Sequence, residues 1–263
     1  MNVPAYLERI HYRGDITRTL DTLRALHVAH MFAVPFENLD IHLGRHIGLD
    51  LDHLHDKIVT QRRGGFCYEL NGLFAALLSH IGFQVELFGA EVVQNGQVNR
   101  NDSHLTLIVR LDEDWLADVG FGDGFFEPLR LDEARDQIQL GHSFRLVRDG
   151  NTITMLERMG DGSEEGYRFE RVPRPFEAFR EMCEWTATSP ESHFTRKRVT
   201  TLPIAGGRVT QSDRRLILTQ GSAREEKELT RSEYESTLRE RFGIALSTGE
   251  LDKLYSGAAA QRE

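Results

Sequence analysis

Residues 63–71 read Arg63-Gly64-Gly65-Phe66-Cys67-Tyr68-Glu69-Leu70-Asn71, and this stretch is the most informative in the chain. The two glycines allow a tight turn, and the cysteine falls in the first turn of a helix that apolar spacing predicts over 67–80. At a helix start, free N–H groups and the positive dipole end favour thiolate over thiol and can hold an oxyanion. Most free cysteines are instead small buried hydrophobic residues. The local pattern therefore leaves Cys67 open as a nucleophile or as a core residue.

A nucleophilic cysteine needs a base, and the base needs an orienting group. Among the eleven histidines, His104 is distinctive because it opens the apolar strand 105–109. Asp118 lies in the apolar run 116–122, where a carboxylate is costly unless it is paired. If the two strands are antiparallel neighbours joined around 112–114, Asp118 lies beside His104 and fixes the imidazole tautomer. Taken alone, a histidine that caps a strand and an aspartate that caps a turn fit the same residues.

The chain divides into a helical first part, a strand-rich middle and a mixed last part. Apolar residues recur at helical spacing through the first eighty residues, with a break at 35–39, because proline cannot continue a helix. Short β-branched or alternating runs then predict a mostly antiparallel sheet or barrel over 83–172. The later elements expected are a helix at 173–186, a hairpin around 205–207, a strand at 216–219 and a helix at 223–242. The fold class is α+β, with expected segments 1–82, 83–186 and 187–263.

Composition excludes several classes of protein. Of the 263 residues, 40% are hydrophobic, which excludes an intrinsically disordered chain. The 32 basic side chains are outnumbered by 41 acidic ones and form no long basic stripe, which argues against non-specific binding of nucleic acid. No apolar run approaches the roughly 18 residues that span a bilayer, and no signal peptide is visible. Two cysteines form no disulfide framework, which favours the reducing cytosol, a cytoplasmic location. We therefore expect neither a nucleic-acid nor a membrane partner.

Weaker patterns are interpreted as structural. The histidines and aspartate at 53–56 do not have zinc-motif spacing, so we expect a solvated helix face and no metal. The run 120–124 lacks the glycine spacing of a dinucleotide site and is expected to be a flexible loop where a ligand approaches the backbone. Cys183 is expected inside a helix, and the charged run 224–228 on an exposed helix face.

Four motifs taken together resemble those of a known family. In chain order they are Pro35-Phe36-Glu37-Asn38-Leu39, the stretch 63–71, the strand that begins at His104, and Asp118-Val119-Gly120-Phe121-Gly122. These motifs, in this order, are similar to those of the arylamine N-acetyltransferases, most closely the bacterial enzymes. The resemblance implies an N-terminal helical bundle, an antiparallel β-barrel and a C-terminal α/β lid. The first two would form a catalytic core like that of papain-type cysteine proteases.

For the reaction, the resemblance implies that Cys67 is the acetylated nucleophile, His104 its base and Asp118 the orienting residue. The thiolate would attack acetyl-CoA, and an arylamine, an arylhydrazine or an N-hydroxyarylamine would then take the acetyl group in a ping-pong cycle. The expected partners are coenzyme A and a small arylamine or hydrazine. A cysteine hydrolase or amidase on the same triad is the alternative, because it differs only in the second nucleophile. A binding module that retains the fold is a further one.

Binding and support positions follow from the same resemblance. The expected arylamine pocket contains Phe36, Phe121 and, from the lid side, Phe194. The expected coenzyme contacts are Gly122, Gly124, Arg196 and Lys197. With Arg198, the last two would form a positive patch toward the coenzyme. The positions that match a buried polar network around the cysteine loop are Glu37, Asn38 and Arg63.

Overall fold

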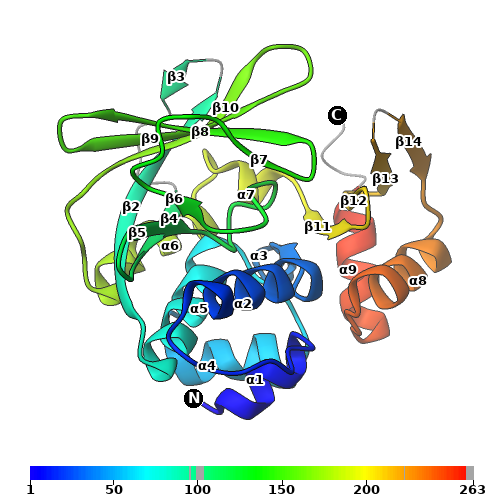
Figure 1. Ribbon diagram of the computed structural model, residues 1–263. Coiled ribbons are helices and arrows are strands. Elements are labelled where there is room, and N and C mark those ends of the chain that lie inside the picture. The colour runs from blue at the N-terminus through cyan, green and yellow to red at the C-terminus, as the bar shows by residue number, and fades with distance from the viewer. Residues whose placement is uncertain (95, 99–103, 222, 259–263) are drawn as a thin grey trace.

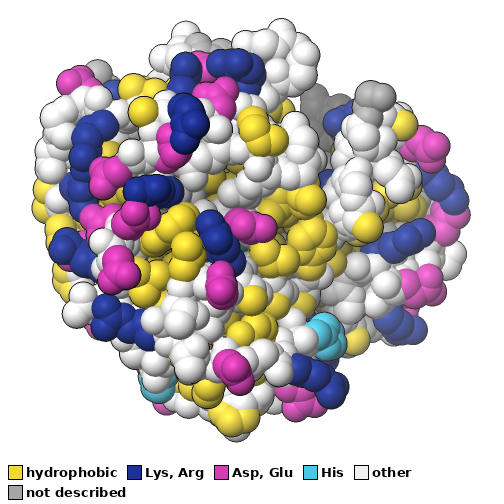
Figure 2. All heavy atoms as spheres, in the orientation of Figure 1, with side chains coloured by type: hydrophobic (Ala, Val, Ile, Leu, Met, Phe, Trp, Pro, Cys, Tyr) yellow, Lys and Arg dark blue, Asp and Glu magenta, His cyan; other side chains and the backbone are white. Residues whose placement is uncertain are grey.

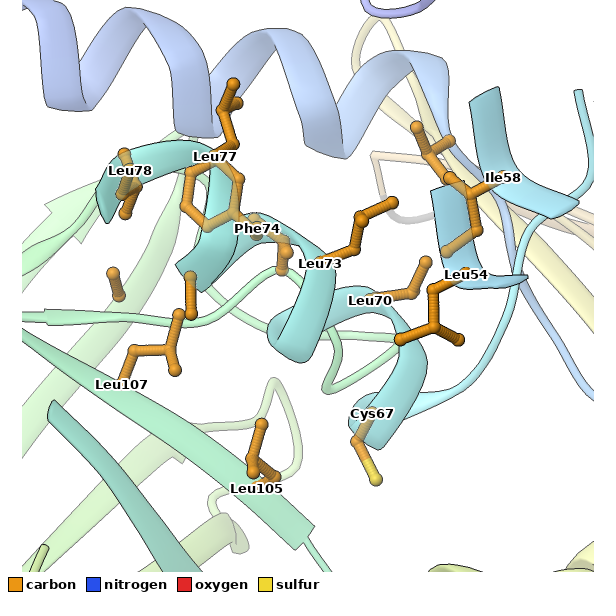
Figure 3. Close-up of a cluster of buried hydrophobic side chains, with 14 of the residues drawn as sticks. Leu54, Ile58, Cys67, Leu70, Leu73, Phe74, Leu77, Leu78, Leu105 and Leu107 are labelled. Carbon is orange, nitrogen blue, oxygen red and sulfur yellow. The ribbon is translucent and has the colours of Figure 1, made fainter. Parts of the chain in front are cut away.

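The computed structural model describes residues 1–94, 96–98, 104–221 and 223–258, and it begins with packed helices (Figure 1). These are α1 (Val3–Arg9), α2 (Leu20–Ala33), α3 (Leu39–Leu43), α4 (Leu51–His55), the π-helical turn η1 (Asp56–Thr60) and α5 (Cys67–Ile81). Thr19 caps α2 by accepting a hydrogen bond from the Thr22 N–H. Helix α5 ends at Gly82, whose φ of +103° suits a residue without a Cβ. The apolar face of α5 packs into the first core, so the helix that begins with Cys67 is held firmly (Figure 3).

A larger sheet covers these helices and curves into a nearly closed antiparallel barrel (Figure 1). Its strands are β2 (Gln84–Gln94), β3 (Gln97–Val98), β4 (His104–Arg110), β5 (Asp114–Ala117), β6 (Leu129–Arg130), β7 (Gln137–Gln139), β8 (His142–Asp149), β9 (Thr152–Arg158) and β10 (Glu164–Glu170). The order is β6-β5-β4-β2-β10-β9-β8-β7, and β3 pairs with β2. At the seam, the side-chain amides of Gln137 and Gln139 bond to main-chain groups of Arg130 and Glu127. These bonds join the two ends of the sheet.

Strand β4 serves two cores because its side chains alternate between the two faces of the sheet. Leu105, Leu107 and Val109 pack against α5 in the first core. Ile108 belongs to a second core inside the barrel. By the same alternation, His104 is on the barrel side, opposite Leu105.

The last part of the chain forms a smaller sheet with two helices on it. Three short helical elements precede this part: η2 (Phe176–Phe179), α6 (Arg180–Thr188) and α7 (His193–Arg196). The strands of the smaller sheet in this part are β11 (Val199–Ile204), β12 (Gly207–Ser212), β13 (Arg215–Gln220) and β14 (Ala223–Glu228), and the two helices are α8 (Arg231–Phe242) and α9 (Thr248–Gly257). The sheet order is β1-β11-β12-β13-β14, where β1 (Phe36–Glu37) comes from the first part of the chain. Since Phe36 also bridges Gly65, β1 connects the cysteine loop to the smaller sheet.

The fold class predicted from the sequence, α+β with helices, a barrel and a second sheet, is confirmed by this architecture. The three-segment division at 1–82, 83–186 and 187–263 stays a prediction. The predicted helix at 223–242 is wrong in its first part, and so is the expected helix face at 224–228. These residues form the edge strand β14, whose residues are all exposed and which pairs with β13, and the helix begins only after the Thr230 cap. Pairing in a hairpin outweighs the helical preference of a charged run.

Two surface findings complete the fold. Among the helices of the described residues, none is long and apolar enough to cross a membrane. On the face shown in Figure 2, lysine and arginine side chains are interspersed with aspartate and glutamate and form no continuous basic stripe.

Candidate active site

Cys67 is the first residue of α5 and is almost fully buried. Figure 3 shows its sulfur directed away from the row of leucines that the helix buries. The loop before it packs so tightly that a Cβ on Gly64 would lie 1.9 Å from the carbonyl oxygen of Pro35. Only glycine allows this approach, so the glycine pair fixes the entry of the chain into α5.

A buried ion network supports the start of α5. Glu69 accepts a hydrogen bond from the Phe66 N–H at 3.1 Å and from Lys57 Nζ at 2.7 Å. Lys57 also contacts Asp40 at 2.9 Å, and Arg63 joins Asp40 to Glu37 at 3.0 and 2.7 Å. Burial alone would lower the pKa of Lys57, but its three carboxylate neighbours hold it above the ordinary value.

The network differs in part from the sequence-based expectation. Arg63 and Glu37 lie in it, together with residues that the sequence analysis did not assign to it: Asp40, Lys57 and Glu69. Asn38 does not. Its amide donates to the carbonyls of Phe194 and Lys197 at 3.0 and 2.7 Å and accepts from the Val199 N–H at 2.8 Å. Asn38 therefore fixes the C-terminal segment instead of the cysteine loop.

His104 and Asp118 meet because β4 and β5 are antiparallel, so the start of one strand lies beside the end of the other. His104 Nε2 and Asp118 Oδ2 are 2.6 Å apart, and both side chains are buried. Asp118 Oδ1 accepts from Asn71 Nδ2 at 2.8 Å and from the Gly120 N–H at 2.9 Å. Burial alone would raise the pKa of Asp118, but His104 and these donors bring it below the ordinary value. The carboxylate is thus charged and holds the imidazole in one orientation.

Two further residues position this pair, and neither is among the site residues predicted from the sequence. Asn71, one helical turn after Cys67, donates to the Leu105 carbonyl at 2.6 Å and accepts from the Val119 N–H at 2.8 Å. His27 Nε2 accepts from the Asp118 N–H at 3.0 Å, so its Nδ1 carries the proton toward the Phe126 carbonyl, 2.7 Å away. The signal in the sequence that indicates such residues is a polar side chain, like that of Asn71 or His27, at a helix position where the periodicity places an apolar one.

Cys67 and His104 line one cavity of about 390 Å³. Its other lining residues are Phe36, Val92, Gly120, Phe121, Trp185, Thr186, Glu191, Ser192, His193 and Phe194. All three phenylalanines expected in the pocket are present. The residues at 185–193 come from the segment around the α6–α7 connection, which no local sequence pattern linked to the cysteine. A second cavity of about 300 Å³ shares Phe36, Phe121, His193 and Phe194 and adds Lys197.

Comparisons with known proteins agree on one family. A family model described as N-acetyltransferase matches residues 19–251. The arylamine N-acetyltransferase / N-hydroxyarylamine O-acetyltransferase of Salmonella typhimurium is 38% identical over 193 residues, 72% of this chain and 69% of that protein. This chain belongs to the arylamine N-acetyltransferase family. It is an acetyltransferase.

Solved structures of other arylamine N-acetyltransferases extend the similarity to nearly the whole fold. The enzyme from Nocardia farcinica is 33% identical, with a TM-score of 0.91 over 100% of this chain and 96% of its own. The Mycobacterium marinum enzyme in complex with CoA is 30% identical, with a TM-score of 0.89 over 98% of each chain.

The environment of the thiol in this arylamine N-acetyltransferase differs from the sequence-based expectation. Burial raises the pKa of Cys67, Asp118 adds to the effect, and main-chain hydrogen bonds from Leu105 and Tyr68 oppose it without reversing it. Burial thus works against the effect of the helix start, which the sequence predicts to favour thiolate. His104 is confined by the rings of Phe121 and Tyr167, with centroids 5.1 and 4.8 Å away.

The residues expected to contact the coenzyme have different surroundings. The Gly122 carbonyl accepts from Arg208 Nη1 at 2.5 Å, and a Cβ on Gly124 would lie 3.3 Å from Phe121. Lys197 lines the second cavity, whereas Arg196 donates to the Glu191 carbonyl at 3.2 Å.

The prediction that Arg196, Lys197 and Arg198 form one positive patch is wrong, because Arg198 is buried and its guanidinium lies 3.5 Å from Asp213. Within the described ranges, no group of three or more His, Cys, Asp or Glu side chains is placed to hold a metal ion.

Proposed function

We propose that the chain transfers the acetyl group of acetyl-CoA to arylamines and arylhydrazines, and to the oxygen of N-hydroxyarylamines, through an acetyl-thioester on Cys67. The observation that carries the proposal is the shared cavity of Cys67 and His104, with His104 bonded to Asp118 at 2.6 Å. Nucleophile, base and orienting carboxylate are the parts that such acyl transfer requires.

In the first half-reaction, the thiol proton passes to His104 as the sulfur attacks the acetyl carbon of acetyl-CoA. Because burial disfavours an isolated thiolate, the charge forms as a thiolate–imidazolium pair, and Asp118 stabilises the imidazolium. Main-chain N–H groups in the first turn of α5 stabilise the tetrahedral oxyanion. The intermediate then expels the CoA sulfur, which takes the proton from His104, and Cys67 carries the acetyl group.

In the second half-reaction, the acceptor nitrogen attacks the acetyl carbon of the thioester. His104 accepts the proton lost by the amine and returns it to the Cys67 sulfur as the C–S bond breaks. The cavity of about 390 Å³ has room for a small aromatic acceptor, and its phenylalanines suit an aryl ring. The aromatic side chains of the lining also disfavour water as the second nucleophile.

We also propose that Gly122, Gly124, Arg196 and Lys197 contact acetyl-CoA, the acetyl donor. The M. marinum relative binds CoA, and Lys197 lies on the second cavity, next to the aromatic residues shared with the first. A cytosolic location is part of the same proposal, since both cysteines are free.

Mass spectrometry of the protein mixed with acetyl-CoA tests this function. We expect one acetyl group on the peptide that contains Cys67, discharged by an added arylamine with formation of the N-acetyl product. Cys67→Ala should carry none, whereas the matched control Cys183→Ala, which removes the other buried thiol, should acetylate normally. Loss of the acetyl group to water at the same rate with and without amine would support a hydrolase instead. No adduct with any short acyl-CoA would overturn the proposal.

A further inference from the structure

The cavity that contains Cys67 has an uneven charge. Among its described lining residues, Glu191 is the one carboxylate, and no lysine or arginine occurs. The remaining titratable side chains there are the Cys67 thiol and the imidazoles of His104 and His193, and His104 is engaged with Asp118. A bound acceptor therefore meets one fixed negative charge.

Glu191 lies in the connection between α6 and α7, and its main chain is held on both sides. Its N–H donates to Ser189 Oγ at 3.2 Å, and its carbonyl accepts from Arg196 Nη2 at 3.2 Å. The residue is exposed, and within the described part of the chain its carboxylate forms no ion pair with Arg196 or any other cation. The main chain of Glu191 is thus held at the edge of the cavity, and within the described residues no ion pair neutralises its carboxylate.

From this placement we infer that Glu191 sets the class of acceptor, an inference that rests on the proposed function. Arylamines and arylhydrazines whose other substituents are neutral or donate hydrogen bonds are accepted. Amines that carry a ring carboxylate, such as aminobenzoates, are disfavoured. The reason is repulsion between two negative charges in one cavity, where the neighbouring aromatic side chains displace part of the water that would screen these charges in bulk. Glu191 is a specificity-determining residue and takes no part in the proton transfers.

Two acceptors of nearly the same shape isolate this charge effect. 4-Aminobenzamide and 4-aminobenzoate differ by an amide in place of a carboxylate. The ratio of their kcat/KM values, measured at pH 8 above the usual titration range of imidazole, is compared between variants so that the different nucleophilicities of the two amines cancel. We expect Glu191→Gln to reduce the amide-to-carboxylate ratio by about three- to tenfold, through faster turnover of the carboxylate.

Glu184→Gln is the matched control. It removes the same charge from an exposed site on α6 outside the cavity lining, so the ratio should stay at the wild-type value. Because Glu191 is exposed, raising the salt concentration should shrink the wild-type ratio toward that of Glu191→Gln, with little effect on the variant.

An unchanged ratio in Glu191→Gln, with acetyl transfer intact, would overturn the role of Glu191 and leave the proposed function standing. Equal effects of Glu184→Gln and Glu191→Gln would also overturn it, since the long-range field would then be responsible. Absence of transfer to both amines in the wild type, together with no acetyl-Cys67, would instead contradict the proposed function itself.

Discussion

The buried histidine His27 shows how one side chain can tie catalytic geometry to stability. It accepts from the main chain of Asp118 and donates to Phe126, which requires the neutral form with the proton on Nδ1. Burial lowers its pKa from 6.5 to about 4. In the unfolded chain the ordinary value applies, so between these two pH values the unfolded state binds the extra proton.

Stability should therefore fall as the pH drops from 6.5 toward 4. The contribution of His27 is complete above pH 6.5 and smaller by about 2 kcal/mol at pH 5. Urea unfolding at pH 7 and pH 5 measures this loss for the wild type and for His27→Gln, whose amide can accept and donate but does not titrate. The variant should lose about 2 kcal/mol less over this interval than the wild type. Equal losses would show that His27 is not the group responsible.

At the residue scale, the sequence predicts a contact where the local pattern itself shows that a polar side chain needs a partner. His104 and Asp118 were paired because each stood at the end of an apolar strand, and β-strand register brought them together. Neither His27 nor Asn71 is predicted from the sequence, because their partners are distant in the chain and most of them are main-chain groups. A helix pattern marks such positions as core without showing what they bind.

At the level of elements, the helix that begins with Cys67 depends on buried charges. Lys57 is 5% exposed and contacts Glu69 and Asp40, each within 3 Å. Burial raises the pKa of Glu69, and Lys57 opposes that rise. Removing the ammonium leaves Glu69 without its cationic partner at the start of α5, whereas Asp40 keeps Arg45 and Arg63.

We expect Lys57→Met to lower the free energy of unfolding by about 3–5 kcal/mol, the usual cost of breaking a buried pair. Lys227→Met is the control, because Lys227 is 62% exposed and pairs with Glu233 at the surface. That change should cost less than about 1 kcal/mol. Denaturant unfolding of both variants at pH 7 checks the difference, and similar small losses would mean that the network does not support α5.

Strand β14 shows where prediction at this level fails. Its sequence, Ala-Arg-Glu-Glu-Lys-Glu, has no apolar alternation, so it reads as the start of a helix. It becomes a strand because β13 offers an open edge to pair with, and its charges then lie on an exposed outer strand. Such tertiary pairing is not visible in local composition.

At the scale of the whole molecule, the cavity exists only because three parts of the chain meet. The cysteine comes from the helical part, His104 from the barrel, and Phe194 from the segment that leads to the smaller sheet. Asn38 is a buried polar link between the first and last of these, since its one side chain bonds to Phe194, Lys197 and Val199.

Asn38→Ala should therefore lower the turnover of the arylamine acceptor more than it lowers the reactivity of Cys67. It removes three side-chain hydrogen bonds at a site that is 1% exposed, so the wall that contains Phe194 keeps the main-chain pairing of β1 with β11 but loses the side-chain bonds next to it. A wall displaced by about 1 Å can lower kcat/KM for an arylamine up to about 100-fold.

Alkylation of Cys67 by iodoacetamide depends on the thiol and His104, and its rate should not fall. Asn38→Asp keeps the acceptor for Val199 and should lie between the wild type and Asn38→Ala. If alkylation and acceptor turnover fell together, Asn38 would be supporting the catalytic core directly, and the cavity would not depend on this link between the two ends of the chain.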